Sequence, residues 1–77
     1  MLAKTAINKL NKKGYEIEEK REGRYIRARK KGKDTIEIRS DRSGVIGYIG
    51  EILNENLAPL DGEIERQQHP NLKSIIG

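Results

Sequence analysis

The residues best able to do chemistry in this chain are cations gathered in one stretch. Between residues 20 and 33 the only acid is Glu22, whereas lysines and arginines fill most other positions. Such a stretch attracts polyanions, above all phosphate backbones, and a tyrosine among the cations can stack on a base. The candidate nucleic-acid-binding residues are therefore Lys20, Arg21, Arg24, Tyr25, Arg27, Arg29, Lys30, Lys31 and Lys33. The competing interpretation is a solvated, charged surface that keeps a small protein soluble.

Groups suited to catalysis or metal binding are few. The single histidine, His69, lies in a polar stretch and is expected to be solvated, and the chain has no cysteine for a thiolate site or a disulfide. Asp34 and Glu37 are three apart on a predicted strand, so they point to opposite faces and cannot share a metal ion. Glu37 is instead expected to balance Arg39 or to face Tyr25. We therefore expect a non-enzymatic protein with no catalytic residue, no metal site and no cofactor.

The composition describes a small, basic, aliphatic domain. The chain has 77 residues, a formal net charge of +4 and no Trp or Phe, and 14 of its 16 Lys and Arg residues lie in residues 1–42. Its core must be built mostly from isoleucine. No apolar run is as long as a membrane span, and no apolar signal segment is evident at the N-terminus, so a cytoplasmic location without membrane partners is expected.

A helix is predicted over residues 2–13, ahead of the stretch that carries these cations. Ala3, Ala6, Ile7 and Leu10 recur at the spacing of one helical face. Gly14 comes where a left-handed residue would end the helix.

Alternation of apolar and polar residues predicts a three-stranded antiparallel meander over residues 15–40. A two-residue turn at Glu22-Gly23 fixes the first register, because glycine accepts the positive φ that such turns need. The pairs it predicts are Glu16–Arg29, Ile17–Ala28 and Glu18–Arg27. A three-residue loop, Lys30-Lys31-Gly32, would then place Ile26 opposite Ile36. The residues expected on the buried face are Tyr15, Ile17, Ile26, Ala28, Ile36 and Ile38, and the other face is expected to be wet.

Residues 45–57 are predicted to form a second helix. Val45, Tyr48, Ile49, Ile52 and Leu53 have helical spacing, and Ser43 is a suitable N-cap. A fourth strand over residues 45–49 is the competing prediction, because two glycines inside a helix are costly.

The predicted architecture is thus an α+β domain, α-β-β-β-α, over residues 1–57, with both helices packed on one face of the sheet. Residues 58–77 are predicted to be a C-terminal tail. The tail is either loosely held or docked on a partner chain, with Glu63–Arg66 pairing to an exposed sheet edge.

Three short segments carry a resemblance to known proteins. The run Ala6–Tyr15, the triplet Gly23-Arg24-Tyr25 and Gly44 resemble the αβββα proteins of the HicA-type mRNA interferase family, which is similar to double-stranded RNA-binding domains. The resemblance implies an RNA-binding fold. Tyr25 stands where that family has its catalytic histidine, so the resemblance implies binding without RNA cleavage.

Two functions follow as alternatives. The first is a small nucleic-acid-binding module that contacts the phosphate backbone through basic loops at the strand ends, with RNA favoured over DNA. The second is a protein-interaction module or small homodimeric regulator that uses helix 45–57 or tail 58–77, because the predicted core is thin for its length.

Overall fold

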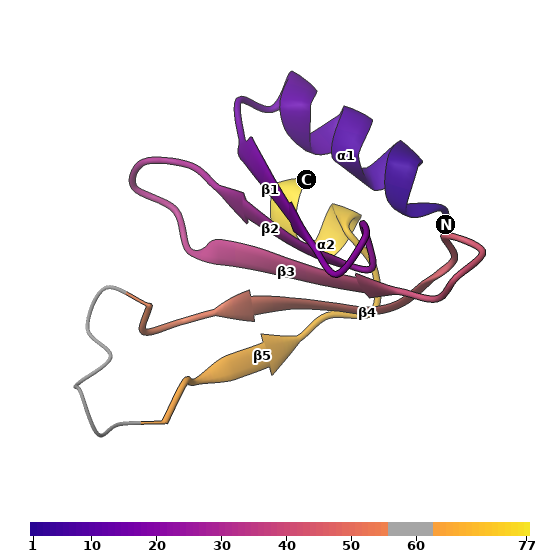
Figure 1. Ribbon diagram of the computed structural model, residues 1–77. Coiled ribbons are helices and arrows are strands. Elements are labelled where there is room, and N and C mark those ends of the chain that lie inside the picture. Colours follow the sequence, from indigo (N-terminus) through magenta and orange to yellow (C-terminus); the bar gives the residue numbers. More distant parts are fainter. Residues whose placement is uncertain (56–62) are drawn as a thin grey trace.

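The computed structural model describes residues 1–55 and 63–77 and forms an α+β fold (Figure 1). Its elements are α1 (Ala3–Lys12), β1 (Glu16–Lys20), β2 (Tyr25–Arg29), β3 (Thr35–Ser40), β4 (Ile46–Ile52), β5 (Arg66–Gln68) and α2 (Lys73–Ile76). The strands form one antiparallel sheet in the order β1-β2-β3-β4-β5. The predicted meander is therefore present, but two further strands extend it.

The first helix and the first hairpin are confirmed. Ala3, Ala6 and Leu10 are buried on one side of α1, and Gly14 follows it with a φ of 88°. The register of β1 and β2 pairs Glu16 with Arg29, Ile17 with Ala28 and Glu18 with Arg27. The turn itself is longer than the predicted two residues: pairing ends at Lys20 and Tyr25, and Arg21, Glu22 and Gly23 all have positive φ. The N–H groups of Gly23 and Arg24 donate to the carbonyls of Lys20 and Arg21, both at 3.2 Å.

The second hairpin has a different register from the predicted one. Ile26 pairs with Ile38, and Ala28 pairs with Ile36, so the loop is two residues longer than expected. A shift of two leaves each side chain on its expected face, because the side-chain period of a strand is two. The longer loop gives both isoleucines of β3 an apolar partner, whereas the shorter one would have set Ile38 opposite Arg24.

The prediction of a helix over residues 45–57 was wrong. Residues 46–52 form β4, which pairs along β3 with Ile49 opposite Ile38 and a bulge near Ser40. Asp41 closes the preceding turn by accepting hydrogen bonds from the N–H groups of Ser43 and Val45, both at 2.9 Å, so Ser43 caps no helix. Pairing satisfies the backbone groups at the edge of β3, which a helix would have left open. Residues 56–57 of the predicted helix lie outside the described residues.

The described part of the predicted tail belongs to the fold. β5 pairs with β4, placing Gln68 opposite Gly50, and Leu72 is buried with only 1% of its surface exposed. Ile75 and Ile76 of α2 pack against the same core. Glu63–Arg66 was expected to pair with a sheet edge; the strand that pairs is Arg66–Gln68, and the edge is that of the chain's own β4. Residues 58–62 of the predicted tail lie outside the described residues.

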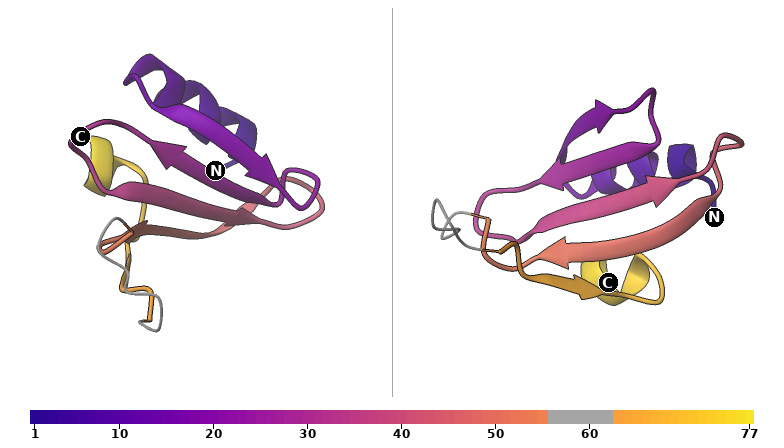
Figure 2. Two further views of the ribbon diagram at one scale, coloured as in Figure 1. Left: turned by 60° about the vertical axis from the view of Figure 1, so that its left-hand side comes forward. Right: turned by 60° about the horizontal axis from the view of Figure 1, so that its bottom comes forward.

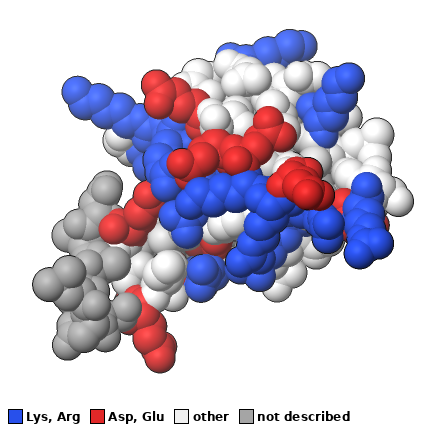
Figure 3. All heavy atoms as spheres, viewed as in Figure 1, with Lys and Arg blue, Asp and Glu red and all other residues white. Residues whose placement is uncertain are grey.

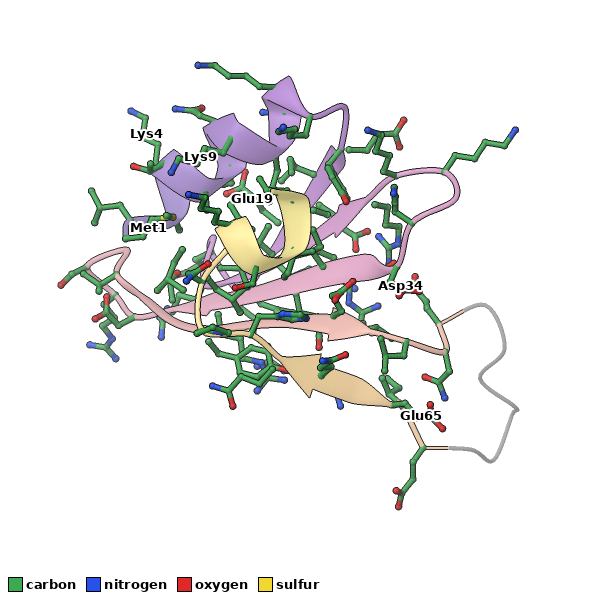
Figure 4. All side chains as sticks on the ribbon, turned by 180° about the vertical axis from the view of Figure 1, so that it is seen from behind. Met1, Lys4, Lys9, Glu19, Asp34 and Glu65 are labelled. Carbon is green, nitrogen blue, oxygen red and sulfur yellow. The ribbon has the colours of Figure 1, made fainter. Side chains whose placement is uncertain are left out.

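Both helices lie on the same side of the sheet (Figures 2 and 4). The core lies between the sheet and these helices. Of the six residues predicted to face it, Ile17 is only partly buried, and the other five are buried: Tyr15, Ile26, Ala28, Ile36 and Ile38. Within residues 1–55 and 63–77 no helix is long and apolar enough to cross a membrane. The opposite side of the sheet, which no described helix covers, is called the open face below.

Candidate nucleic-acid interface

The open face carries cations contributed by four of the five strands. The strand registers place on it Lys20, Tyr25, Arg27, Arg29, Glu37, Arg39, Tyr48 and Arg66. Figure 3, which shows this side of the molecule, has Lys and Arg side chains across the strands with acidic side chains among them. The sheet thus gathers cations that are far apart in the sequence.

One line of side chains runs across four strands and alternates cations with aromatic rings. Lys20 pairs with Tyr25, Tyr25 with Arg39, and Arg39 with Tyr48. The Arg39 guanidinium carbon lies 5.5 Å from the centre of the Tyr25 ring and 5.6 Å from that of Tyr48. Arg21 and Arg27 lie over the Tyr25 ring as well, at 5.7 and 5.4 Å. These distances are those of cation–π contacts. We call Lys20, Tyr25, Arg39 and Tyr48 the Tyr–Arg row.

A buried carboxylate lies beside this row. Glu37 is fully buried; its carboxylate accepts a hydrogen bond from the Tyr25 hydroxyl and another, at 2.8 Å, from Nε of Arg66. Nε of Arg27 in turn donates to the Tyr25 hydroxyl at 2.8 Å. Glu37 does face Tyr25, as expected. The expectation of a wet open face was wrong at its centre, because long arginine and tyrosine side chains lie over the carboxylate and exclude water from it.

The hydrogen bonds fix the ionisation of both partners. Burial by itself would raise the pKa of Glu37, but the hydrogen bonds from Tyr25 and Arg66 and the charges of Arg66 and Arg39 lower it below the ordinary value. Burial, followed by the hydrogen bond to Glu37, raises the pKa of the Tyr25 phenol. At neutral pH the pair is therefore a carboxylate with a neutral phenol.

Glycine at position 50 allows the row to lie close to the sheet. A Cβ at Gly50 would collide with the hydroxyl end of the Tyr48 side chain and would lie 3.0 Å from the carbonyl oxygen of Gln67. The Tyr48 side chain therefore runs along β4 over a position that has no side chain. By contrast, nothing lies within 4 Å of a Cβ at Gly47.

Some of the predicted binding residues are already paired with acids. Arg29 contacts Glu18 at 3.2 Å and Glu55 at 2.9 Å, and Lys20 lies 3.7 Å from Glu18. The hydrogen bond to Glu55 raises the pKa of Arg29 more than burial lowers it, so Arg29 stays protonated. Its positive charge is balanced by the two carboxylates beside it. Arg29 thus has less positive potential to offer a phosphate than its position suggests.

The other predicted residues fall into two groups at opposite ends of β2. Arg21 and Arg24 lie in the turn between β1 and β2, where Arg24 is 3.8 Å from Glu22. Lys30, Lys31 and Lys33 lie in the loop between β2 and β3, and Lys30 Nζ donates to the Lys13 carbonyl at 2.6 Å. The structure brings Lys20, Arg21, Tyr25 and Arg27 together and leaves the loop lysines apart from them.

Sequence reasoning missed three residues of this face: Arg39, Tyr48 and Arg66 were not among the candidate binding residues. The alternation in residues 35–39 placed Arg39 on the outer side, which was a usable signal. Tyr48 was assigned to the core of a helix that does not form. Arg66 was assigned to the tail, and nothing in its neighbourhood in the sequence indicates a contact with Glu37.

His69 was expected to be solvated, and this was wrong. Its Nε2 lies 2.6 Å from Oε1 of Glu51, and the two side chains are 14% and 19% exposed. Glu51 pairs with Ile36 and therefore lies on the helix-covered side of the sheet, beside the loop that leads to α2. In the part of the chain that the structure describes, no three His, Asp or Glu side chains are grouped as a metal site would require.

The open face, with its row of rings and cations around a buried carboxylate, is the most distinctive chemical feature of the described residues. Its arrangement depends on cross-strand pairs from β1 to β4 and on Arg66 of β5. In comparisons with known proteins, no family model, no curated protein and no solved structure matches the chain.

Proposed function

We propose that this protein is a small non-enzymatic nucleic-acid-binding module. It contacts the phosphate backbone through the cations of the open face and of the two loops at the ends of β2, and it prefers RNA to DNA. The observation that carries the proposal is the Tyr–Arg row, which presents cations and rings on a sheet face that no described helix covers.

The supply of free positive charge supports this function. Among the described carboxylates, none forms an ion pair with Arg21, Arg27, Arg39, Lys31 or Lys33. If these five cations each engage one phosphate, the logarithm of the binding constant falls with the logarithm of salt concentration at a slope of roughly −4.

The resemblance of Ala6–Tyr15 and Gly23-Arg24-Tyr25 to HicA-type interferases supports RNA as the ligand, whereas Gly44 lends no support because β4, not a helix, follows it. It also supports binding without cleavage, since Tyr25 occupies the place of that family's histidine. The Tyr25 hydroxyl donates a hydrogen bond to Glu37, and burial raises the pKa of the phenol, so the phenol stays protonated and is a poor base near neutral pH.

The test is a binding titration with labelled RNA, followed by fluorescence anisotropy over a range of salt concentrations. Arg39→Glu and Lys31→Glu should each weaken binding and make the salt slope shallower by about one or more. Lys9→Glu changes the net charge equally but lies on α1, on the other side of the sheet (Figure 4), and should leave the affinity nearly unchanged. Failure to bind RNA or DNA at low salt, or a slope near zero, would rule the function out.

A groove between α1 and α2 favours the alternative function, protein interaction. The groove encloses about 310 Å³; Met1, Leu72 and Ile76 form its apolar lining, and the lysines around it are Lys9, Lys12, Lys13 and Lys73. No described carboxylate pairs with these lysines. An acidic amphipathic helix of a partner protein fits this chemistry. A second copy of the chain fits poorly, because its lysines would face these lysines.

Light scattering after size exclusion and titration with an acidic amphipathic peptide test this alternative. A monomer that binds the peptide, and loses that binding in Lys12→Glu, supports protein interaction through the groove. A monomer that ignores the peptide, or a dimer that survives Lys12→Glu, counts against it.

A further inference from the structure

We infer that the open face selects single-stranded nucleic acid, whose bases stack on the Tyr–Arg row while its phosphates meet the surrounding cations. This inference rests on the proposed function and specifies its ligand. A duplex covers the flat faces of its bases by pairing and stacking, so only unpaired bases can use rings and guanidinium planes on a protein surface.

The row has the geometry of a stacking platform. Arg39 lies between the rings of Tyr25 and Tyr48, about equally far from both. Aromatic rings and guanidinium groups both offer flat faces to bases, and stacking of this kind tolerates any sequence. The three side chains come from adjacent strands, so their spacing is set by the sheet rather than by mobile loops.

The exposure of the row identifies which members can receive a base. Tyr25 is only 9% exposed and is covered by arginines, so it supports the row from below. Arg39 is exposed and Tyr48 is half-buried, and the Tyr48 side chain lies over Gly50, where no side chain rises beside it. The incoming bases therefore meet Arg39 and Tyr48 first.

The row ends at a hollow that can accept the edge of a base. This hollow encloses about 280 Å³. Tyr48 lines it together with polar residues (Gln68, His69, Asn71) and apolar ones (Met1, Ile46, Ile49, Pro70). The side-chain amide of Gln68 can both donate and accept hydrogen bonds, which suits base edges. Oδ1 of Asn71 already accepts hydrogen bonds from the N–H and hydroxyl of Ser74, so Asn71 offers a base its amide donors. A base that stacks on Tyr48 would thus find polar partners at the rim of the sheet.

The buried carboxylate of Glu37 holds Tyr25, the supporting member of the row, in place before any ligand arrives. It accepts the hydrogen bond of the Tyr25 hydroxyl, and Arg27 donates to the same hydroxyl. A surface whose side chains are already fixed loses less conformational entropy on binding than a mobile one. Glu37 is therefore a positioning residue for the platform.

The experiment compares single-stranded RNA with a duplex of the same strand length, using anisotropy at several salt concentrations. The variants are Tyr48→Leu, which keeps apolar bulk but removes the ring, and Tyr48→Phe, which keeps the ring. Tyr48→Leu should weaken single-strand binding about tenfold with little change in salt slope, because stacking is not an ionic contact. Tyr48→Phe should retain the wild-type affinity, and circular dichroism should show both variants folded.

A second variant, Arg39→Lys, keeps the charge but removes the flat guanidinium plane. It should also weaken single-strand binding while preserving the salt slope. Equal affinity for the duplex and the single strand, or an affinity that Tyr48→Leu leaves unchanged, would overturn the stacking platform and leave the proposed function standing. Absence of binding to either form would remove the proposed function itself.

Discussion

Nε of Arg66 lies 2.8 Å from Oε1 of Glu37, although 29 residues separate them in the sequence. The contact joins β5 to β3 diagonally across β4, because Arg66 pairs with Ile52 whereas Glu37 pairs with Gly50. Glu37 is fully buried, whereas the side chain of Arg66 is 37% exposed. The last strand thus completes the charge balance of a carboxylate in the middle of the sheet, and the open face depends on it.

Removing Arg66 should destabilise the fold. Arg66→Ala leaves the Glu37 carboxylate buried with fewer donors, and an unsatisfied buried charge of this kind costs about 1–3 kcal/mol. Urea denaturation at neutral pH measures the loss. Arg24→Ala is the matched control, because its partner Glu22 is 87% exposed and exposed pairs contribute about 0–1 kcal/mol. Equal stability of the two variants would mean that Glu37 does not need Arg66.

Stability should fall at acidic pH because of Glu37. Its pKa is lower in the folded protein than the ordinary value, so the folded state favours the carboxylate. This contribution is complete above the ordinary pKa of 4.5 and is lost as pH falls through the lower folded-state pKa. Glu37→Gln lacks this titration, so its unfolding free energy should be lower than that of the wild type at neutral pH and approach it in acid.

Urea titrations at a series of pH values test this convergence. Glu22→Gln, which alters an exposed carboxylate, should keep the wild-type pH profile. If the difference between wild type and Glu37→Gln stayed constant from neutral to acidic pH, the ionised state of Glu37 would not stabilise the fold.

The sequence predicted the first 40 residues well because their signals are local. Helix spacing placed α1, and turn chemistry at Glu22-Gly23 fixed the first register. The predicted second register was wrong by two residues, because the loop residues do not fix the length of the loop. The pairing of Ile38 with Ile26 favours the longer loop. The faces were still right, because such a slip does not change the alternation.

Residues 45–52 and the tail could not be predicted from local signals. Val45, Tyr48, Ile49 and Ile52 suit a helix by spacing, but β3 offers an unpaired edge, and a strand there satisfies more backbone groups. The bulge near Ser40 also breaks the alternation that would have identified a strand. Because the helix was favoured over the competing prediction of a strand at residues 45–49, the Tyr–Arg row and the contact of Arg66 with Glu37 were not anticipated.

Gly50 should be intolerant of a side chain. Gly50→Ala places a Cβ against the hydroxyl end of Tyr48 and close to the Gln67 carbonyl, so the ring or the β4–β5 pairing must shift. Overpacking of this kind typically costs about 1–3 kcal/mol. Gly47→Ala, where nothing lies within 4 Å of the new Cβ, is the control and should be nearly neutral. Thermal unfolding of the two variants gives the comparison, and a Gly50→Ala protein as stable as Gly47→Ala would show that the Tyr48 side chain does not rest on this position.

Leu72 should be as important to the fold as a residue of the central strands. It is 1% exposed and lies in the same core as Leu10 and Ile38, although it follows the last strand. Leu72→Ala should therefore cost about 2–5 kcal/mol, because it removes buried methyl groups and leaves a cavity. Leu53→Ala makes the same chemical change where the leucine is 41% exposed, and it should cost much less. Urea denaturation distinguishes the two variants. A Leu72→Ala protein with nearly wild-type stability would restore the view of residues 63–77 as a loosely held tail, and the Arg66 contact with Glu37 would then have to form without support from α2.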